Sequence, residues 1–236
     1  MSRRVLVLAY DFPPAGGGGV QRTTKFVRYL PEFGWRPTVL TVHPGGYFAY
    51  DEALLAELRE VGIPIHRTAS LDPTRLFGGR AVVKLPEESK RQVLSALSQY
   101  LFIPDNKIGW MPFAIREGRR LLHEQSFDLI FSSAPPYTGH LVAGRLSKQA
   151  DLPLVTDFRD DWVGNPRHVY PTVLHRWLHQ RLEHGVLRAS RHVLTINEPI
   201  RDALVERNTQ DGFSPRVTVL PQGFDGGDFS EALPVR

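Results

Sequence analysis

The regular alternation of short apolar segments with longer segments of helical periodicity most restricts the fold of this chain. Apolar residues fill the short segments almost continuously, as in VLVLA at residues 5–9, which is typical of strands buried on both faces of a sheet. The predicted strands are residues 5–9, 37–42, 63–66, 128–132, 153–157, 192–196 and 216–220. The predicted helices are residues 20–33, 51–61, 112–124, 137–149, 171–187 and 199–207. This alternation predicts an α/β fold: a Rossmann-like, mostly parallel seven-stranded sheet with helices on both faces.

The same alternation predicts the domain organisation. We expect residues 1–222 to form one Rossmann-like domain and residues 223–236, rich in Gly, Asp and Pro, to form a hinge or linker. Residues 70–110 interrupt the pattern as a helical insertion, in which residues 87–101 have the spacing of an amphipathic helix. An insertion of this length is often functional, but a lid over one sheet edge explains it equally well.

Composition excludes several classes of protein. The chain has 236 residues and no cysteine, so it holds no disulfide, thiolate metal site or cysteine nucleophile. Its apolar segments are shorter than a transmembrane helix of about 18 residues, and the first one is too short for a signal peptide. We therefore expect a cytoplasmic protein.

The distribution of charge leaves one question open. A net charge of +4 is too small to indicate a nucleic-acid partner. The basic residues concentrate between Arg167 and Arg207, however. They form either a solvated helix face or a surface that faces phosphates, such as peripheral contact with the inner, anionic leaflet of a membrane.

A glycine-rich loop follows the first predicted strand and indicates an anion site. It contains Gly16, Gly17, Gly18 and Gly19 and continues into a helix with Gln21 and Arg22 in its first turn. Glycines let backbone N–H groups approach a phosphate, and the helix N-terminus adds positive potential. The run Val-Gln-Arg after the glycines is not that of a P-loop, and the G-x-G-x-x-G dinucleotide fingerprint is absent.

Two further loops follow predicted strands, where open parallel sheets bind their ligands. The loop after residues 128–132 carries Ser133, Tyr137 and His140. His140 either faces the cleft or packs on the helix. We expect Ser133 and Tyr137 to contribute to substrate binding.

The loop after residues 153–157 is the most polar. It reads Asp157-Phe158-Arg159-Asp160-Asp161-Trp162, and its carboxylates suit general-base work or recognition of sugar hydroxyls, while Trp stacks on sugar faces. The alternative is a helix cap with a structural Arg–Asp bridge. No histidine stands at ligand spacing, so we expect no metal site.

These segments together resemble glycosyltransferase family 4, whose enzymes have the GT-B fold. The likeness rests on VLVLAYDFPPAGGGGVQRTTKFVRYLPEFGWRPTVLTV, IPDNKIGWMPFA, FSSAPPYTGHLVAGRL, DLPLVTDFRDDW and VTVLPQGFDGGDF, in this order, and covers the chain as the N-terminal, acceptor-side domain. The resemblance implies a retaining transferase that moves a sugar from a nucleotide-diphosphate sugar to an acceptor without metal or other cofactor. It also implies that Gly16 to Gly19 close over the donor diphosphate.

The resemblance has two departures from the family pattern. Many relatives carry a histidine after the fourth strand, where this chain has Ser132 and Ser133. Asp157, Asp160 or His140 are the candidates to replace it. The C-terminal donor-binding domain of the family is also missing, so we expect this chain alone to be inactive or nearly so.

The implied role is a step in cell-surface polysaccharide or glycolipid synthesis, with a sugar or lipid-linked acceptor. Two alternatives stay open from the sequence. One is a standalone Rossmann-type module that binds a sugar or nucleotide without catalysis. The other is a GT-B sugar-nucleotide epimerase.

Overall fold

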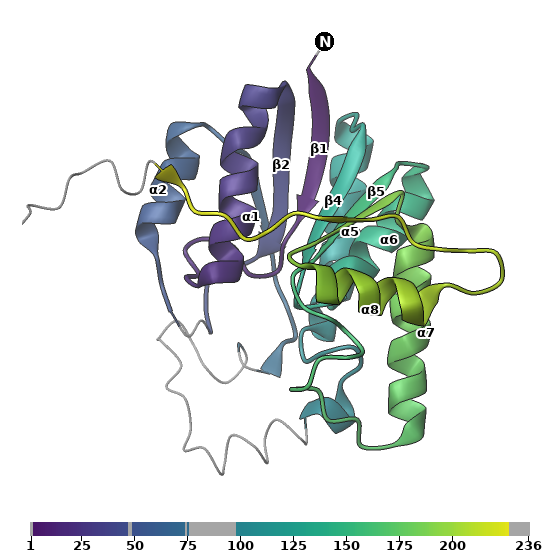
Figure 1. Cartoon of the computed structure of the whole chain (residues 1–236). Coiled ribbons are helices and arrows are strands. Elements are labelled where there is room, and N and C mark those ends of the chain that lie inside the picture. The colour runs from purple at the N-terminus through teal and green to yellow at the C-terminus, as the bar shows by residue number, and fades with distance from the viewer. Residues whose placement is uncertain (1, 47–48, 74, 76–97, 227–236) are drawn as a thin grey trace, which may run out of the picture.

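The computed structural model describes residues 2–46, 49–73, 75 and 98–226. All the predicted strands lie in one sheet with the order β3-β2-β1-β4-β5-β6-β7, in which every neighbouring pair is parallel (Figure 1). The strands are β1 Arg3–Leu8, β2 Trp35–Val42, β3 Ile65–Thr68, β4 Leu129–Ala134, β5 Leu154–Phe158, β6 His192–Thr195 and β7 Val217–Val219. This confirms the predicted Rossmann-like α/β fold.

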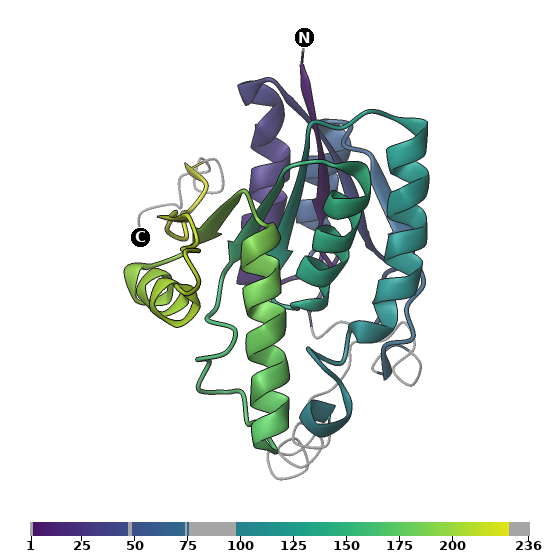
Figure 2. The same cartoon turned by 90° about the vertical axis from the view of Figure 1, so that its right-hand side faces the viewer.

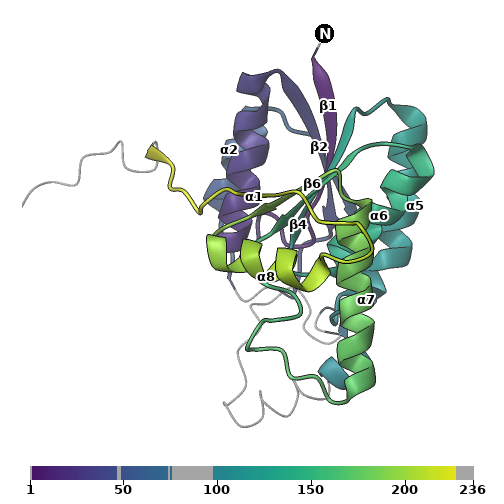
Figure 3. The same ribbon diagram turned by 45° about the vertical axis from the view of Figure 1, so that its right-hand side comes forward.

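Helices cover both faces of the sheet because alternate strand residues point to opposite sides. The helices are α1 Gly18–Tyr29, α2 Glu52–Glu60, α5 Met111–Glu124, α6 Thr138–Ala150, α7 Val173–Ala189 and α8 Glu198–Asn208. From β1, Val5 and Val7 pack toward α1 and α2, whereas Leu6 and Leu8 pack toward α5 and α6. Figure 3 shows α1 and α2 on one side of the strands and α5, α6 and α7 on the other.

The predicted helix over residues 20–33 is two elements. The α-helix α1 ends at Tyr29, and a 3₁₀ turn, η1 Leu30–Phe33, follows it. Pro31 has no N–H to continue the α-helical hydrogen bonds, and Gly34 closes the turn with a φ of 78°. Most of the helix predicted over residues 87–101 lies outside the described residues.

Side-chain caps begin three of the helices. Asp51, Thr172 and Asn197 each accept a hydrogen bond from the backbone N–H three residues ahead, at the starts of α2, α7 and α8. Asp105 caps α6 from a distant part of the chain, since its Oδ2 accepts a hydrogen bond from the N–H of Thr138 at 3.0 Å. Helix α1 has no such cap and no acidic residue in its first turn.

Candidate functional site

The loops that follow β1, β4 and β5 meet at one edge of the sheet. These strands are neighbours, and the register places Leu8 of β1 beside Ser132 of β4 and Ser133 beside Asp157 of β5. The structure therefore brings together the glycine loop, the Ser133 loop and the acidic loop that the sequence singled out.

Arg22 and Asp157 form a closed, buried ion pair at this edge. Arg22 donates from Nη2 to Oδ1 of Asp157 at 2.9 Å and from Nε to Oδ2 at 3.1 Å. Ser133 Oγ also donates to Oδ2, at 2.8 Å. The remaining Arg22 donors bond the carbonyls of Leu220 and Pro221 after β7, and the side chains of the pair are 2% and 0% exposed.

These contacts leave neither partner open to a ligand. Phosphate binding by Arg22, substrate binding by Ser133 and catalysis by Asp157 require polar atoms that are here already bonded to one another. The pair instead ties the start of α1 to the end of β5 and to the chain after β7. The predicted roles of Arg22, Ser133 and Asp157 in substrate binding and catalysis stay predictions, and the geometry supports a structural role for all three.

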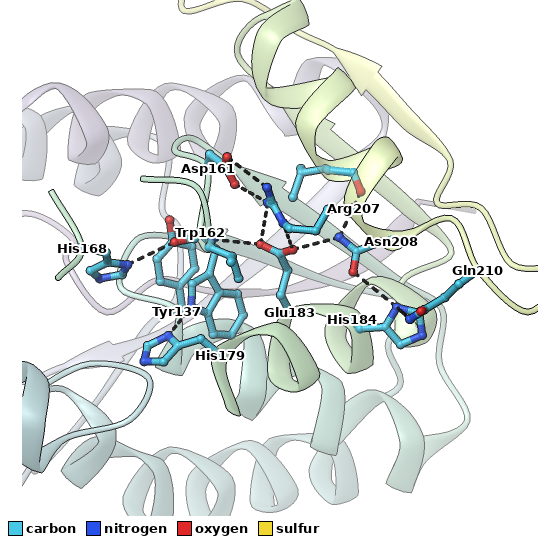
Figure 4. A network of polar contacts seen from close by, with 12 residues as sticks. Tyr137, Asp161, Trp162, His168, His179, Glu183, His184, Arg207, Asn208 and Gln210 are labelled. Atoms are coloured by element: carbon cyan, nitrogen blue, oxygen red, sulfur yellow. Dashed lines mark hydrogen bonds and ion pairs between the residues drawn. The ribbon is translucent and has the colours of Figure 1, made fainter. Parts of the chain in front are cut away.

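Asp161 and Trp162 belong to a second polar network (Figure 4). Asp161 is paired with Arg207, whose Nε donates to the buried Glu183 at 2.9 Å. Glu183 also accepts from Asn208 Nδ2 at 2.8 Å and from the backbone N–H of Val163 at 3.1 Å. This network fastens the acidic loop to α7 and α8, which is the structural Arg–Asp alternative that the sequence left open.

Trp162 is buried and stacks on a protein ring instead of facing a cleft. Its ring lies parallel to that of Tyr137 at 4.4 Å, with an interplanar angle of 7°. Its Nε1 donates to Nδ1 of His179 at 3.0 Å. Neither Trp162 nor Tyr137 presents a face to a sugar here, because both rings are buried in a cluster with apolar residues of β4, β5 and β6 and of α7 and α8.

His140 also packs into the protein. It is fully buried on α6, with Nδ1 2.9 Å from Ser132 Oγ, and its ring lies 4.6 Å from that of Phe158. Nε2 is buried and has no hydrogen-bond partner within the described ranges. Burial, and then the positive charge of Arg159, lowers the pKa of His140 to about 3, so the ring is neutral near pH 7. Of the two alternatives for His140, packing on the helix is the one found.

Arg159 is a charged side chain at this edge that keeps one donor nitrogen without a hydrogen bond to the described residues. Its Nε donates to the carbonyl of Ala134 at 3.2 Å and its Nη2 to that of Pro135, while Nη1 makes no hydrogen bond to the described residues. The guanidinium lies against Gly19, where an added Cβ would stand only 1.8 Å from Nη1. A side chain at position 19 would therefore displace the Arg159 guanidinium, which now occupies that space.

The start of α1 lies beside that guanidinium. Gly17 precedes α1 with a φ of 115°, in the region that favours glycine, and makes no side-chain cap. The N–H groups of Gly18 and Gly19 have no hydrogen-bond acceptor among the residues that the structure describes. Gly16 is held separately, since its N–H donates to the carbonyl of Ala49 at 3.0 Å. Two free N–H groups, a helix N-terminus and Arg159 together attract an anion.

Asp11 is a residue of this edge that sequence reasoning passed over. Its half-buried carboxylate has no hydrogen bond or ion pair in the described part of the chain. Burial raises the pKa of Asp11, and the positive charges of Lys107 and Arg159 oppose that shift. Its place in the loop after β1, three residues beyond the strand, could have singled it out, but the glycines dominate the loop. Asp160, by contrast, was singled out and is exposed.

The insertion over residues 70–110 supplies a polar cluster beside Asp11, which the sequence did not indicate. Asp72 is fully buried and accepts from Tyr10 Oη and Lys107 Nζ, each at 2.6 Å. Arg75 Nε donates to Tyr10 Oη at 2.8 Å. This part of the insertion thus packs on the sheet edge that carries the candidate site.

An apolar groove of about 790 Å³ lies away from this edge, on the face that carries α1. Phe26 of α1 and Phe131, Val155 and Leu194 of the sheet line it, with residues 220–225 along its rim. It holds none of the open polar groups described above. Gln21, a predicted binding residue, lines this groove beside Arg22. Within the described ranges no group of three or more His, Cys, Asp or Glu residues could hold a metal ion, and no helix there could cross a membrane.

The comparisons with known proteins agree with this architecture. The model of the glycosyl transferase 4-like domain family matches residues 17–223. The crystal structure of Anabaena Alr3699/HepE in complex with UDP and glucose has a TM-score of 0.53 and 18% identity, covering 94% of this chain and 45% of that one. A search of curated proteins gives no match.

Two plant structures are similar at the level of the fold. Glycyrrhiza uralensis UGT73P12, complexed with glycyrrhetinic acid 3-O-monoglucuronide, has a TM-score of 0.51 and 11% identity, covering 93% of this chain and 48% of that one. Medicago truncatula UGT71G1, complexed with UDP-glucose, has a TM-score of 0.51 and 9% identity, covering 93% and 51%. This chain thus spans about half the length of each structure. Since the family model covers most of the chain, the protein belongs to the glycosyl transferase 4-like domain family.

Proposed function

We propose that this chain is the acceptor-side half of a retaining glycosyltransferase that uses a nucleotide-diphosphate sugar as donor and needs no metal or other cofactor. The family match supports the transferase class. The similar Anabaena and Medicago proteins were crystallised with UDP and glucose or with UDP-glucose, which supports a nucleotide sugar as donor. A role in cell-surface polysaccharide or glycolipid synthesis, with a sugar or lipid-linked acceptor, is part of the proposal.

The observation that carries the proposal is the open anion site at the start of α1. The N–H groups of Gly18 and Gly19 and the Nη1 of Arg159 have no partner in the described ranges and lie together. A diphosphate fits this set, because it accepts several hydrogen bonds and carries the charge that the helix N-terminus and a guanidinium stabilise. Gly16 and Gly17 shape the turn that leads the chain there.

The acceptor side of the proposal rests on Asp11 and Asp160. Among the proposed catalytic residues, Asp157 and His140 are fully buried, whereas Asp160 is exposed. Asp11 adds a half-buried carboxylate beside Arg159. A carboxylate in this setting accepts a hydrogen bond from a sugar hydroxyl and orients it toward the donor.

We propose further that the chain by itself binds nucleotide sugars weakly and transfers little. It spans about half the length of the similar structures, and one side of the donor would be left in water. Joined to a donor-binding domain of the family, it should turn over donor.

Titration of the ¹⁵N-labelled chain with UDP-glucose tests the anion site. We expect amide shifts at residues 17–22 and a dissociation constant in the millimolar range. Arg159→Ala should weaken binding at least about tenfold, because a charge-assisted hydrogen bond contributes about 1.5–3 kcal/mol. Gly19→Ala should weaken it as well by displacing the guanidinium.

Gly144→Ala in α6 is the control for Gly19→Ala, since an added Cβ there meets nothing within 4 Å and the position lies outside the glycine loop. Equal effects of the two glycine variants, or unchanged binding in Arg159→Ala, would argue against the site. Micromolar binding by the chain alone would favour the standalone module instead of the transferase half.

A further inference from the structure

The first half of α7 and the two segments beside it form an apolar surface that no described part of the protein covers. Its residues are between 46% and 86% exposed, although they are large and apolar. This surface, here called the α7 tip, consists of Tyr100, Leu101, Val169, Val173, Leu174 and Trp177. Residues of this kind, gathered in one place on a protein surface, usually mark an interaction site.

Contacts between the two segments make the α7 tip continuous. His175 of α7 contacts Tyr100 twice, through Nε2 at 3.2 Å from its carbonyl oxygen and through rings 5.3 Å apart. The backbone N–H of Val169 donates to Gln99 Oε1 at 2.7 Å. The segment around residue 100 and the start of α7 therefore lie side by side.

The exposed charges along residues 164–191, which include the start of α7, are of one sign. Arg167, Arg176 and Arg181 are exposed, and the guanidinium of Arg181 lies 5.0 Å from the ring centre of Trp177. Between residues 164 and 191 the only acidic residue is Glu183, which is fully buried and bonded to Arg207 and Asn208. The exposed part of this stretch thus presents arginines and apolar side chains with no opposing charge.

The position of the α7 tip relates it to the candidate site. In Figures 1 and 2, α7 extends beyond the carboxyl ends of the strands, and its first turns lie near the lower end of the described part of the chain in both views. The candidate site lies at those same strand ends. A surface seated on the α7 tip would therefore lie on the side from which an acceptor reaches Asp11 and Asp160.

We propose that the α7 tip docks on a lipid bilayer with anionic headgroups. A bilayer interface takes apolar and aromatic side chains into the acyl boundary while lipid phosphates bind the surrounding arginines. An acidic protein would match the charge, but it would not account for Val173 and Leu174, which point to solvent between the arginines at the end of a helix. This inference rests on the proposed function, because it assigns a membrane as the source of the acceptor.

Vesicle flotation with the whole chain tests this proposal without any sugar donor, so its failure would leave the transferase proposal untouched. The chain should float with phosphatidylglycerol-containing vesicles and not with pure phosphatidylcholine, and less at high salt. Arg176→Glu with Arg181→Glu should weaken binding at least about tenfold, as should Val173→Glu with Leu174→Glu. All these positions are exposed, so the fold should tolerate the changes.

Matched controls lie at the opposite end of the molecule. Arg36→Glu with Arg59→Glu makes the same charge change at exposed positions, and Phe33→Glu replaces an exposed aromatic residue. Vesicles should also shift Trp fluorescence to the blue in the wild-type chain and much less in Trp177→Phe. Absence of flotation, equal flotation with neutral vesicles, or equal losses in the controls would overturn the proposal; flotation losses without any Trp177 shift would point to charge attraction alone and overturn insertion.

Discussion

Two arginine–aspartate pairings, Arg22 with Asp157 and Arg159 with Asp11, connect the same two loops. They differ in how many of their polar atoms remain without a hydrogen bond. The loop after β1 and its helix supply Asp11 and Arg22, and the end of β5 with its loop supplies Asp157 and Arg159. Arg22 and Asp157 bond one another in a fork and are almost fully buried. Arg159 and Asp11 interact only through their charges and keep unbonded polar atoms among the described residues.

The difference lies in where each pair sits relative to the sheet. Asp157 is the second-last residue of β5 and stays between neighbouring strands, where a lone charge would be costly and a partner is required. Arg159 and Asp11 lie beyond the strand ends, where water still reaches them. Identical residue types thus hold the two loops together in one case and keep unbonded charged atoms at the edge of the sheet in the other.

The largest effect is expected from Asp157→Ala. It leaves the Arg22 guanidinium buried without its carboxylate, so we expect the free energy of unfolding to fall by about 3–5 kcal/mol. Urea denaturation measures this. Asp160→Ala, at an exposed position in the same loop, should change the free energy by less than about 0.5 kcal/mol. A loss below about 1 kcal/mol for Asp157→Ala would show that the closed pair is dispensable.

A smaller effect is expected from the titration of His140, whose pKa is lowered in part by the charge of Arg159 in the second pairing. Its pKa is about 3 in the folded protein and about 6.5 in an unfolded chain. Between these values the unfolded state binds more protons, so stability falls as the pH falls, by up to about 1.4 kcal/mol per pH unit. Burial lowers the pKa of His179 to about 4, which adds to the same trend.

Urea denaturation at pH 7, 6 and 5 measures the slope, and His140→Gln should make it shallower. The variant also changes the contact to Ser132, so its absolute stability is not the test. An unchanged slope would mean that His140 becomes protonated within the folded protein.

The smallest effect is expected from Asp11→Asn, and it has the opposite sign. The pKa of Asp11 is raised, so the folded protein keeps this proton to higher pH than the unfolded chain does. Stability is therefore lost as the pH rises from about 4 through the folded pKa. The amide removes this loss, so Asp11→Asn should be slightly more stable than wild type at pH 7 and equal to it near pH 3. Thermal unfolding at both pH values measures the difference, and a less stable variant at pH 7 would indicate that the carboxylate has a bonded partner.

Much of the architecture follows from the sequence because burial patterns are local. Every predicted strand is present with ends shifted by a few residues, since a run such as residues 5–9 suits little else than a strand buried on both sides. The break at Pro31 was missed because the apolar spacing continues through it to Phe33. The sequence also located the glycine loop, whose anion binding stays a prediction. That Gly19 makes room for Arg159 is a contact that no local pattern predicts.

By itself the sequence determined the order of strands and helices, the edge at which their loops meet and the residue types gathered there. Only the tertiary structure decided which of those residues stay open. The sequence predicted functional roles for Asp157, Trp162 and His140. In the structure they are buried against residues distant in sequence or on the preceding strand and loop: Asp157 against Arg22, Trp162 against Tyr137 and His140 against Ser132. Burial of a polar group depends on what packs over it from elsewhere, and a residue's own neighbours in sequence do not carry that information.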